Sequence, residues 1–188
     1  MTPLFVSALV VAIAEIGDRT QLLAILLAVR FRKPWLILAG ILAATLANHA
    51  LAATAGYFVA DLLQGQGVRI AIALSFIAMA AWILIPDTGD DTAVSGSGAN
   101  VFLATLVAFF LVEMGDKTQI ATVALAARFH DIAFVAAGTT LGMMAANAPA
   151  VFLGEAATRV VPLRYVRWGA GALFFGLGVW ALAEALRP

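Results

Sequence analysis

Two hexapeptides place carboxylates and a basic residue in apolar surroundings. EIGDRT begins at Glu15 and EMGDKT begins at Glu113, and each holds two acids and one base. The first motif follows eleven mostly apolar residues from Leu4 to Ala14, which puts its acids near the middle of a membrane span. An isolated charge there costs at least ~2.5 kcal/mol, so ionisable residues at this depth indicate a functional site.

If each motif is helical, its spacing places the charged residues on one face. Asp18 would lie about 60° around the axis from Glu15, and Arg19 about 40°. The second motif has the same arrangement in Glu113, Asp116 and Lys117. A structural alternative is an ion pair within each motif, base four residues after glutamate. Even then one acid per motif stays uncompensated, and the surplus of two negative charges matches one divalent cation or two protons. Exchanging the divalent cation for two protons is the chemistry of a cation/proton antiporter.

Other polar residues of the motifs suggest further roles. Gly17 and Gly115 fit either a helix break that frees carbonyl oxygens or close packing of small residues. Gln21 and Gln119 could each add an amide oxygen to a metal site. The motif threonines are expected to bond back to backbone carbonyls instead.

Three polar residues lie deep in other apolar segments. Asn48, His49 and Asn147 either hydrogen-bond a neighbouring helix or belong to the site, and the sequence leaves both interpretations open. We predict Asn147 as a ligand and His49 as a proton relay, since histidine changes charge near neutral pH. Asn48 and His49, with Arg19 and Lys117, are the predicted site supports or proton-coupling groups.

The composition is that of an all-α integral membrane protein. Of 188 residues, 63% are hydrophobic and 12% charged, with a mean hydropathy of +1.01. A soluble domain carries about 25% charged residues. Six apolar segments can be marked as membrane helices, and several approach the roughly 20 residues needed to cross a bilayer. They are Leu4 to Val29, Trp35 to Ala60, Ile70 to Ile85, Val101 to Ala127, Ile132 to Ala157 and Trp168 to Leu186.

The two halves of the chain repeat each other. At an offset of 98 residues, EIGDRTQLLAILLAVRF aligns with EMGDKTQIATVALAARF, with nine of seventeen positions identical. The offset also pairs Gly40 with Gly138, Gly56 with Gly154 and His49 with Asn147. We predict three-helix repeats at 1–86 and 101–188, joined by an acidic Gly/Ser linker at 87–100. Three spans per half would make the repeats inverted, a common architecture of secondary transporters.

Loop charges predict the orientation. Six basic residues lie on the face of the linker: Arg30, Arg32, Lys33, Arg159, Arg164 and Arg167. The opposite face has three: Arg69, Arg128 and Arg187. Because Lys and Arg concentrate in cytoplasmic loops, we expect the linker inside and both termini outside the cell's inner (plasma) membrane.

Composition also limits the cofactors and partners. The chain has no cysteine, so an oxygen-rich site for manganese, calcium or magnesium is expected. The net charge is zero and the chain has no tail rich in Lys and Arg, so no nucleic-acid partner is expected. The linker acids Asp87, Asp90 and Asp91 lack EF-hand spacing and fit a solvated loop. No cofactor is expected besides the transported ion, and the sequence does not decide whether the protein forms a homodimer.

The duplicated E-x-G-D-(K/R)-T motif resembles the signature of a family of small membrane proteins. That family includes Golgi and chloroplast-envelope manganese/calcium transporters and bacterial manganese exporters. The segments LANHALAATAG and MAANAPAVFLG add to a likeness that covers essentially the whole chain. The resemblance implies six helices in two inverted repeats and export of manganese or calcium in exchange for protons. It implies four motif acids at the site: Glu15, Asp18, Glu113 and Asp116.

Our leading hypothesis is therefore a secondary antiporter rather than an enzyme. A divalent ion would enter from the cytoplasm, bind the four acids with Gln21, Gln119 and Asn147, and leave outside by alternating access. One alternative is a passive divalent-cation channel with the acids as its filter. A remote one is an intramembrane aspartyl protease using Asp18 and Asp116.

Overall fold

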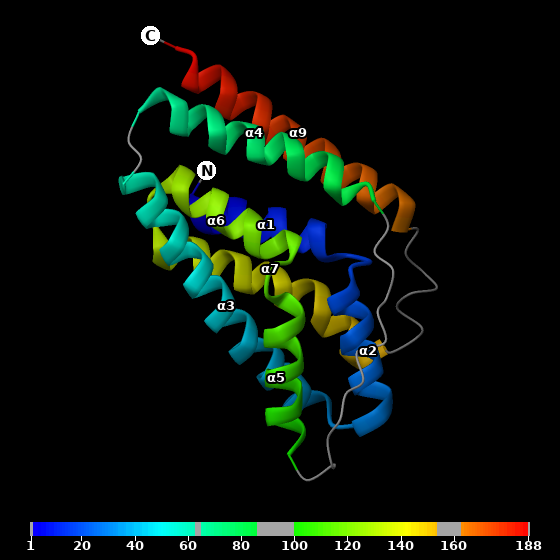
Figure 1. Ribbon diagram of the computed structural model, residues 1–188. Helices are drawn as coiled ribbons and strands as arrows, with labels where there is room; N and C mark the ends of the chain where they lie inside the picture. Colours follow the sequence, from blue (N-terminus) through cyan, green and yellow to red (C-terminus); the bar gives the residue numbers. More distant parts are fainter. Residues whose placement is uncertain (1, 63–64, 86–99, 154–162, 188) are drawn as a thin grey trace.

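The computed structural model describes residues 2–62, 65–85, 100–153 and 163–187. All regular secondary structure within these ranges is helical, which confirms the predicted all-α class (Figure 1). The helices are α1 (Pro3–Glu15), α2 (Arg19–Phe31), α3 (Pro34–Leu62), α4 (Gln66–Ile83), α5 (Val101–Glu113), α6 (Lys117–Phe129), α7 (Ile132–Leu153) and α9 (Leu163–Ala185).

The first and fourth apolar segments are each two helices, not one. α1 ends at Glu15 and α2 begins at Arg19, and the second motif separates α5 from α6 in the same way. Gly17 has φ 81° and Gly115 has φ 80°, a left-handed conformation that residues with a Cβ rarely adopt. Of the two interpretations of these glycines, the helix break is therefore confirmed, and the charged face expected on a continuous helix does not form.

Helix boundaries follow the 98-residue offset found in the sequence. The starts of α1, α2 and α3 recur 98 residues later as the starts of α5, α6 and α7. The C-caps of α2 and α6 also match, because Arg32 and His130 both adopt left-handed backbone angles, with φ of 51° and 55°. The same local folding rules thus act on both halves. The predicted linker lies outside the described residues except for Asn100, as do Gly154 and Arg159.

The two halves pack crosswise. α1 packs along α7 and α5 packs along α3, so each motif segment contacts the long helix of the other half. Glycines allow the closest approach: a Cβ at Gly138 would lie 2.4 Å from the Leu4 carbonyl oxygen, and one at Gly142 would lie 2.4 Å from that of Ala8. α4 and α9 form an antiparallel pair beside α1 and α6 (Figure 1).

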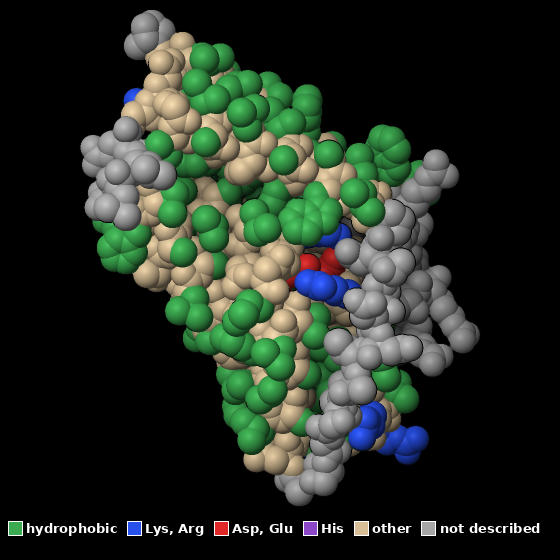
Figure 2. All heavy atoms as spheres, in the orientation of Figure 1, with side chains coloured by type: hydrophobic (Ala, Val, Ile, Leu, Met, Phe, Trp, Pro, Cys, Tyr) green, Lys and Arg blue, Asp and Glu red, His purple; other side chains and the backbone are tan. Residues whose placement is uncertain are grey.

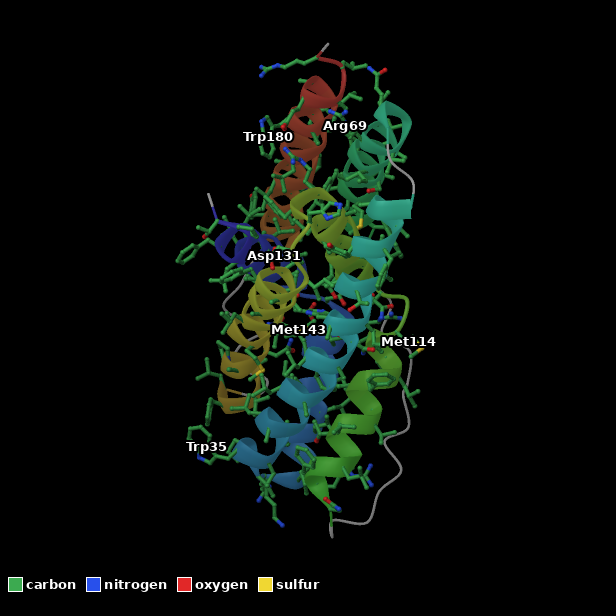
Figure 3. All side chains as sticks on the ribbon, turned by 90° about the vertical axis from the view of Figure 1, so that its left-hand side faces the viewer. Trp35, Arg69, Met114, Asp131, Met143 and Trp180 are labelled. Carbon is green, nitrogen blue, oxygen red and sulfur yellow. The ribbon has the colours of Figure 1, made fainter. Side chains whose placement is uncertain are left out.

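Large apolar side chains cover much of the described surface. Within the described ranges, four helical segments are long and apolar enough to cross a membrane: Pro34–Ala60, Gln66–Ile83, Ile132–Leu153 and Trp168–Ala185. α1 and α5 are apolar but shorter. Large apolar side chains such as Phe5, Trp35 and Trp168 point outward, and Figure 2 shows apolar groups spread over the visible face. Trp35 lies at one end of the molecule and Arg69 and Trp180 at the other, with Met143 between (Figure 3).

Candidate metal centre

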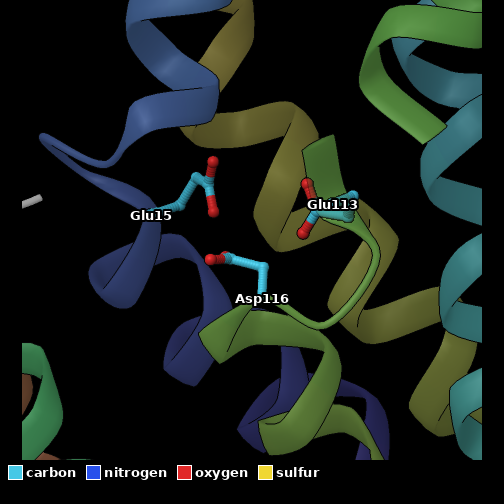
Figure 4. Close-up of side chains that lie close together, drawn as sticks. All are labelled: Glu15, Glu113 and Asp116. Carbon is cyan, nitrogen blue, oxygen red and sulfur yellow. The ribbon is translucent and has the colours of Figure 1, made fainter. Parts of the chain in front are cut away.

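Three motif acids converge where the two helix breaks meet. Glu15, Glu113 and Asp116 each direct a carboxylate oxygen to one point, and these three oxygens lie within 4.8 Å of one another (Figure 4). The side chains come from the end of α1, the end of α5 and the N-cap of α6. All three residues are buried, at 0, 1 and 3% exposure. Residues 98 apart in the chain are thus brought into one cluster.

The fourth motif acid, Asp18, belongs to an ion pair between the motifs. Its Oδ1 lies 3.6 Å from Lys117 Nζ, and the partner pair joins Arg19 Nη2 to Asp116 Oδ1 at 3.0 Å. Arg19 also donates to the Val112 carbonyl at 3.0 Å. Each base therefore forms an ion pair with the aspartate of the opposite motif. The alternative of local pairs is wrong, because the break at each glycine turns the base away from its own glutamate.

The cluster retains more acceptors than donors. One oxygen on each of Glu15, Glu113 and Asp116 is buried and accepts no hydrogen bond from the described residues. Buried polar atoms in proteins are almost always hydrogen-bonded. With Asp18, Arg19 and Lys117 included, the site carries two net negative charges when every group is ionised. Its carboxylate oxygens suit a hard divalent cation, and the same charge is matched by two protons.

The motif glutamines stabilise the breaks. Gln21 Oε1 accepts a hydrogen bond from Gly17 N at 2.9 Å, and Gln119 Oε1 accepts one from Gly115 N at 2.6 Å. Gln21 Nε2 also donates to the Ala146 carbonyl of α7 at 3.1 Å. Backbone donors exposed by the break are thus satisfied by side chains. Coordination of a metal by these two glutamines stays a prediction.

The threonines of the two motifs differ in their contacts. Thr118 Oγ1 donates a hydrogen bond to Glu113 Oε1, which orients that carboxylate. The expectation that this hydroxyl would bond to a backbone carbonyl is wrong, because the helix break places Glu113 beside it. The hydroxyl of Thr20 is buried and has no hydrogen-bond partner among the described residues.

Two of the three polar residues outside the motifs reach the acids. Asn147 Nδ2 lies 3.4 Å from Glu15 Oε1, and His49 Nε2 lies 3.9 Å from Glu113 Oε1. Asn48 Nδ2 instead donates to the Phe110 carbonyl at 3.0 Å, so it ties α3 to α5. Since positions 49 and 147 are related by the repeat offset, each glutamate has a polar neighbour from the long helix of the other half.

The sequence interpretation missed one neighbour of the cluster. Met143 Sδ lies 3.0 Å from Asn147 Nδ2, so a thioether stands beside the amide that contacts Glu15. Its position one helical turn before Asn147 was the available signal. An oxygen-rich environment was expected because the chain has no cysteine, and that expectation overlooked methionine sulfur.

The motif region reaches the surface beside α4 and α9. A small pocket of about 10 Å³, room for roughly one water molecule, is lined by Gly17, Asp18 and Lys117 together with Ile83 and Ala170. Figure 2 shows acidic and basic side chains together in an otherwise apolar face. The charged groups are therefore buried but lie close to the outside of the helix bundle.

Apolar helices around a buried cluster of carboxylates define a membrane protein that handles cations. The protein belongs to the family described as "Divalent cation/proton antiporter GDT1", whose model matches residues 3–91 and 101–188. The resemblance seen in the sequence is thus confirmed, and since this is a family of transporters, the protease alternative is wrong.

Similar proteins occur in bacteria and plants. The chain is 48% identical over 187 residues to a "Putative manganese exporter" of Vibrio cholerae serotype O1, covering 98% of this chain and 91% of the relative. It is 29% identical to GDT1-like protein 3 of Oryza sativa subsp. indica, covering 94% and 72%. GDT1-like protein 3 of Arabidopsis thaliana is 28% identical, over 94% and 69%. No solved structure matches.

Proposed function

We propose that this protein exports Mn²⁺ from the cytoplasm in exchange for protons, at a site built on four carboxylates. The observation that carries the proposal is the convergence of Glu15, Glu113 and Asp116 within 4.8 Å, each with an oxygen that accepts no hydrogen bond from the described residues. The relative from Vibrio cholerae is named as a manganese exporter, which supports this choice of ion. Ca²⁺ is the second candidate because it prefers the same hard oxygen ligands.

The ion-pair network supports a definite division of roles. Glu15, Glu113 and Asp116 would bind the ion directly, and Asp18 would join them when its distance from Lys117 increases. Arg19 and Lys117 hold the aspartates in place and limit the surplus charge to two. Gln21, Gln119 and Asn147 are further candidate ligands, and His49 beside Glu113 is the candidate proton relay. Either Mn²⁺ or two protons then makes the site neutral, which is the condition for exchange.

The packing of α4 and α9 supports alternating access. In this structure α9 contacts α1 and α4 contacts α6. The repeat-related contacts would be α4 with α5 and α9 with α2, and the described residues make no comparable contact there. If the halves form inverted three-helix repeats, exchanging their conformations would move the α4–α9 pair to the other side of the acid cluster. The ion would then face opposite sides of the membrane in the two states.

The proposed topology keeps six spans, two of them broken at the motifs. α3 and α7 run in opposite directions (Figure 3), as inverted repeats require. The turn between α2 and α3 and the start of α5 lie at one end, and the end of α9 lies at the other (Figure 1). We place the first end in the cytoplasm and both termini outside, in the plasma membrane, because Arg30, Arg32 and Lys33 lie near it.

Reconstituted vesicles test the proposal. Full-length protein in proteoliposomes should dissipate a preset proton gradient when Mn²⁺ is added, and Glu15→Gln should abolish that flux because the site loses a ligand and a charge. Glu184→Gln is the matched control, since this acid pairs with Arg128 at the far ends of α6 and α9. Proton-coupled Mn²⁺ flux that is unchanged in Glu15→Gln would refute the site. Currents that reverse at the Nernst potential of the metal, with no dependence on protons, would identify a channel instead.

A further inference from the structure

Met143 occupies an unusual place beside the acid cluster. The residue is fully buried at 0% exposure and lies midway along the molecule (Figure 3). Its sulfur is 3.0 Å from Asn147 Nδ2, and the same nitrogen is 3.4 Å from Glu15 Oε1. One amide group therefore separates the thioether from a carboxylate of the candidate metal site.

A cation at the cluster would change what this amide does. An amide nitrogen donates hydrogen bonds and does not bind metal ions, so the present contact between Asn147 and Glu15 opposes a cation at that oxygen. Asn147 Oδ1 is buried and has no hydrogen-bond partner among the described residues. Turning the amide would present Oδ1 to the ion and release the contact with Met143 Sδ. The long, unbranched methionine side chain could then bring its sulfur toward the ion.

Sulfur would change the metal preference of the site. Ca²⁺ and Mg²⁺ are hard ions that take oxygen ligands, whereas a thioether is a soft ligand that favours transition metals. Carboxylates alone suit manganese and calcium alike. We propose that Met143 is a specificity-determining residue that makes this site select Mn²⁺ over Ca²⁺. This inference rests on the proposed transport function.

The repeat makes this soft contribution one-sided. The position related to Met143 by the 98-residue offset is Thr45, a buried residue with a hydroxyl oxygen and no sulfur. Likewise, the position related to Asn147 is His49, near Glu113. The sulfur therefore acts on the Glu15 side alone, and removing it would leave the carboxylates, both histidine and asparagine, and the ion pairs in place.

Binding measurements on purified full-length protein test the inference. We would titrate Mn²⁺, Ca²⁺ and Cd²⁺ by calorimetry into wild type, Met143→Leu and the neighbouring control Met144→Leu. Leucine keeps the apolar volume and removes the sulfur. In Met143→Leu the ratio of Ca²⁺ to Mn²⁺ dissociation constants should fall by about three- to tenfold, which corresponds to about 0.7–1.4 kcal/mol. The preference for Cd²⁺, close to Ca²⁺ in size but softer, should fall further.

The outcomes separate the inference from the function on which it rests. Met143→Leu that binds with the wild-type selectivity ratio would overturn the role of Met143, while wild-type protein without proton-coupled Mn²⁺ flux would overturn the transport function. Met143→Gln offers an oxygen in place of sulfur and should shift the ratio toward Ca²⁺, so it tests the inference if the leucine variant does not fold. An equal loss of selectivity in Met144→Leu would show a packing effect and also overturn the assignment.

Discussion

The pair formed by Asp18 and Lys117 gives a quantitative test of the charge balance. The two charged atoms are 3.6 Å apart, and the side chains are only 4 and 5% exposed. At an effective dielectric constant of about 20, their attraction is about 4.6 kcal/mol. Replacing Lys117 by Met leaves a buried carboxylate without this base, and replacing Asp18 by Asn leaves a buried ammonium without this acid. Each single change should cost about 3–5 kcal/mol of stability.

The double variant Asp18→Asn with Lys117→Met should recover part of both losses. It removes the two charges together, so it should be more stable than either single variant by at least about 1 kcal/mol. Thermal unfolding in detergent measures this coupling. The control cycle uses Arg128→Met and Glu184→Gln, a pair whose side chains are 27 and 46% exposed. Solvent screens such a pair, and its coupling should be about 0–1 kcal/mol.

Transport by the same variants tests whether the site must carry two negative charges. The net charge with all groups ionised would be −3 in Lys117→Met, −1 in Asp18→Asn and again −2 in the double variant. Proton-coupled Mn²⁺ flux should therefore fall in both single variants and recover in the double one. Strictly additive losses of stability and flux would refute the cross-motif pairing and the charge balance built on it.

Three further predictions concern the breaks and the ion. Gly17→Ala and Gly115→Ala should each destabilise the protein by about 1–2 kcal/mol in thermal unfolding, because a left-handed φ is unfavourable for alanine. The control Gly67→Ala in α4, where the added Cβ meets open space, should not destabilise the protein in this way. Thr118→Val should raise the KM for Mn²⁺ by up to about tenfold by removing the hydrogen bond that orients Glu113, while unchanged kinetics would exclude that role. Mn²⁺ should raise the unfolding temperature of wild type, less at acid pH where protons compete, and not that of Glu113→Gln.

The helical class and the repeat could be predicted from the sequence because both depend on local patterns. Apolar runs of membrane length predict helices without any tertiary information, and the 98-residue offset recurs in the helix boundaries. The breaks could not be predicted in the same way. Gly17 is compatible with a tight packing contact as well as a left-handed turn, and nothing in the hexapeptide decides between them.

The partners of the charged residues depended on that undecided point. On an unbroken helix Arg19 would lie beside Glu15, so the local pair was a reasonable interpretation. Because the backbone turns at Gly17, Arg19 is the first residue of α2 and its side chain pairs with Asp116. Asn147 lies near the acids, and so does His49, its repeat-related residue, because each contacts the glutamate of the opposite half. Met143 has an apolar side chain in an apolar helix, and its position one turn before Asn147 was its single signal.

The differences between the halves cannot by themselves set the direction of the proposed transport. His49 lies near Glu113, whereas the repeat-related Asn147 lies near Glu15. The first motif has Arg19 at the position where the second has Lys117, so the two sides of the cluster are unequal. Such asymmetry can make one conformation more stable, but a carrier that returns to its starting state after each cycle gains no net work from it. In the proposed antiport, export would therefore draw its energy from protons that enter as Mn²⁺ leaves. Two protons per Mn²⁺ would match the charge of the proposed site, and this exchange would move no net charge across the membrane.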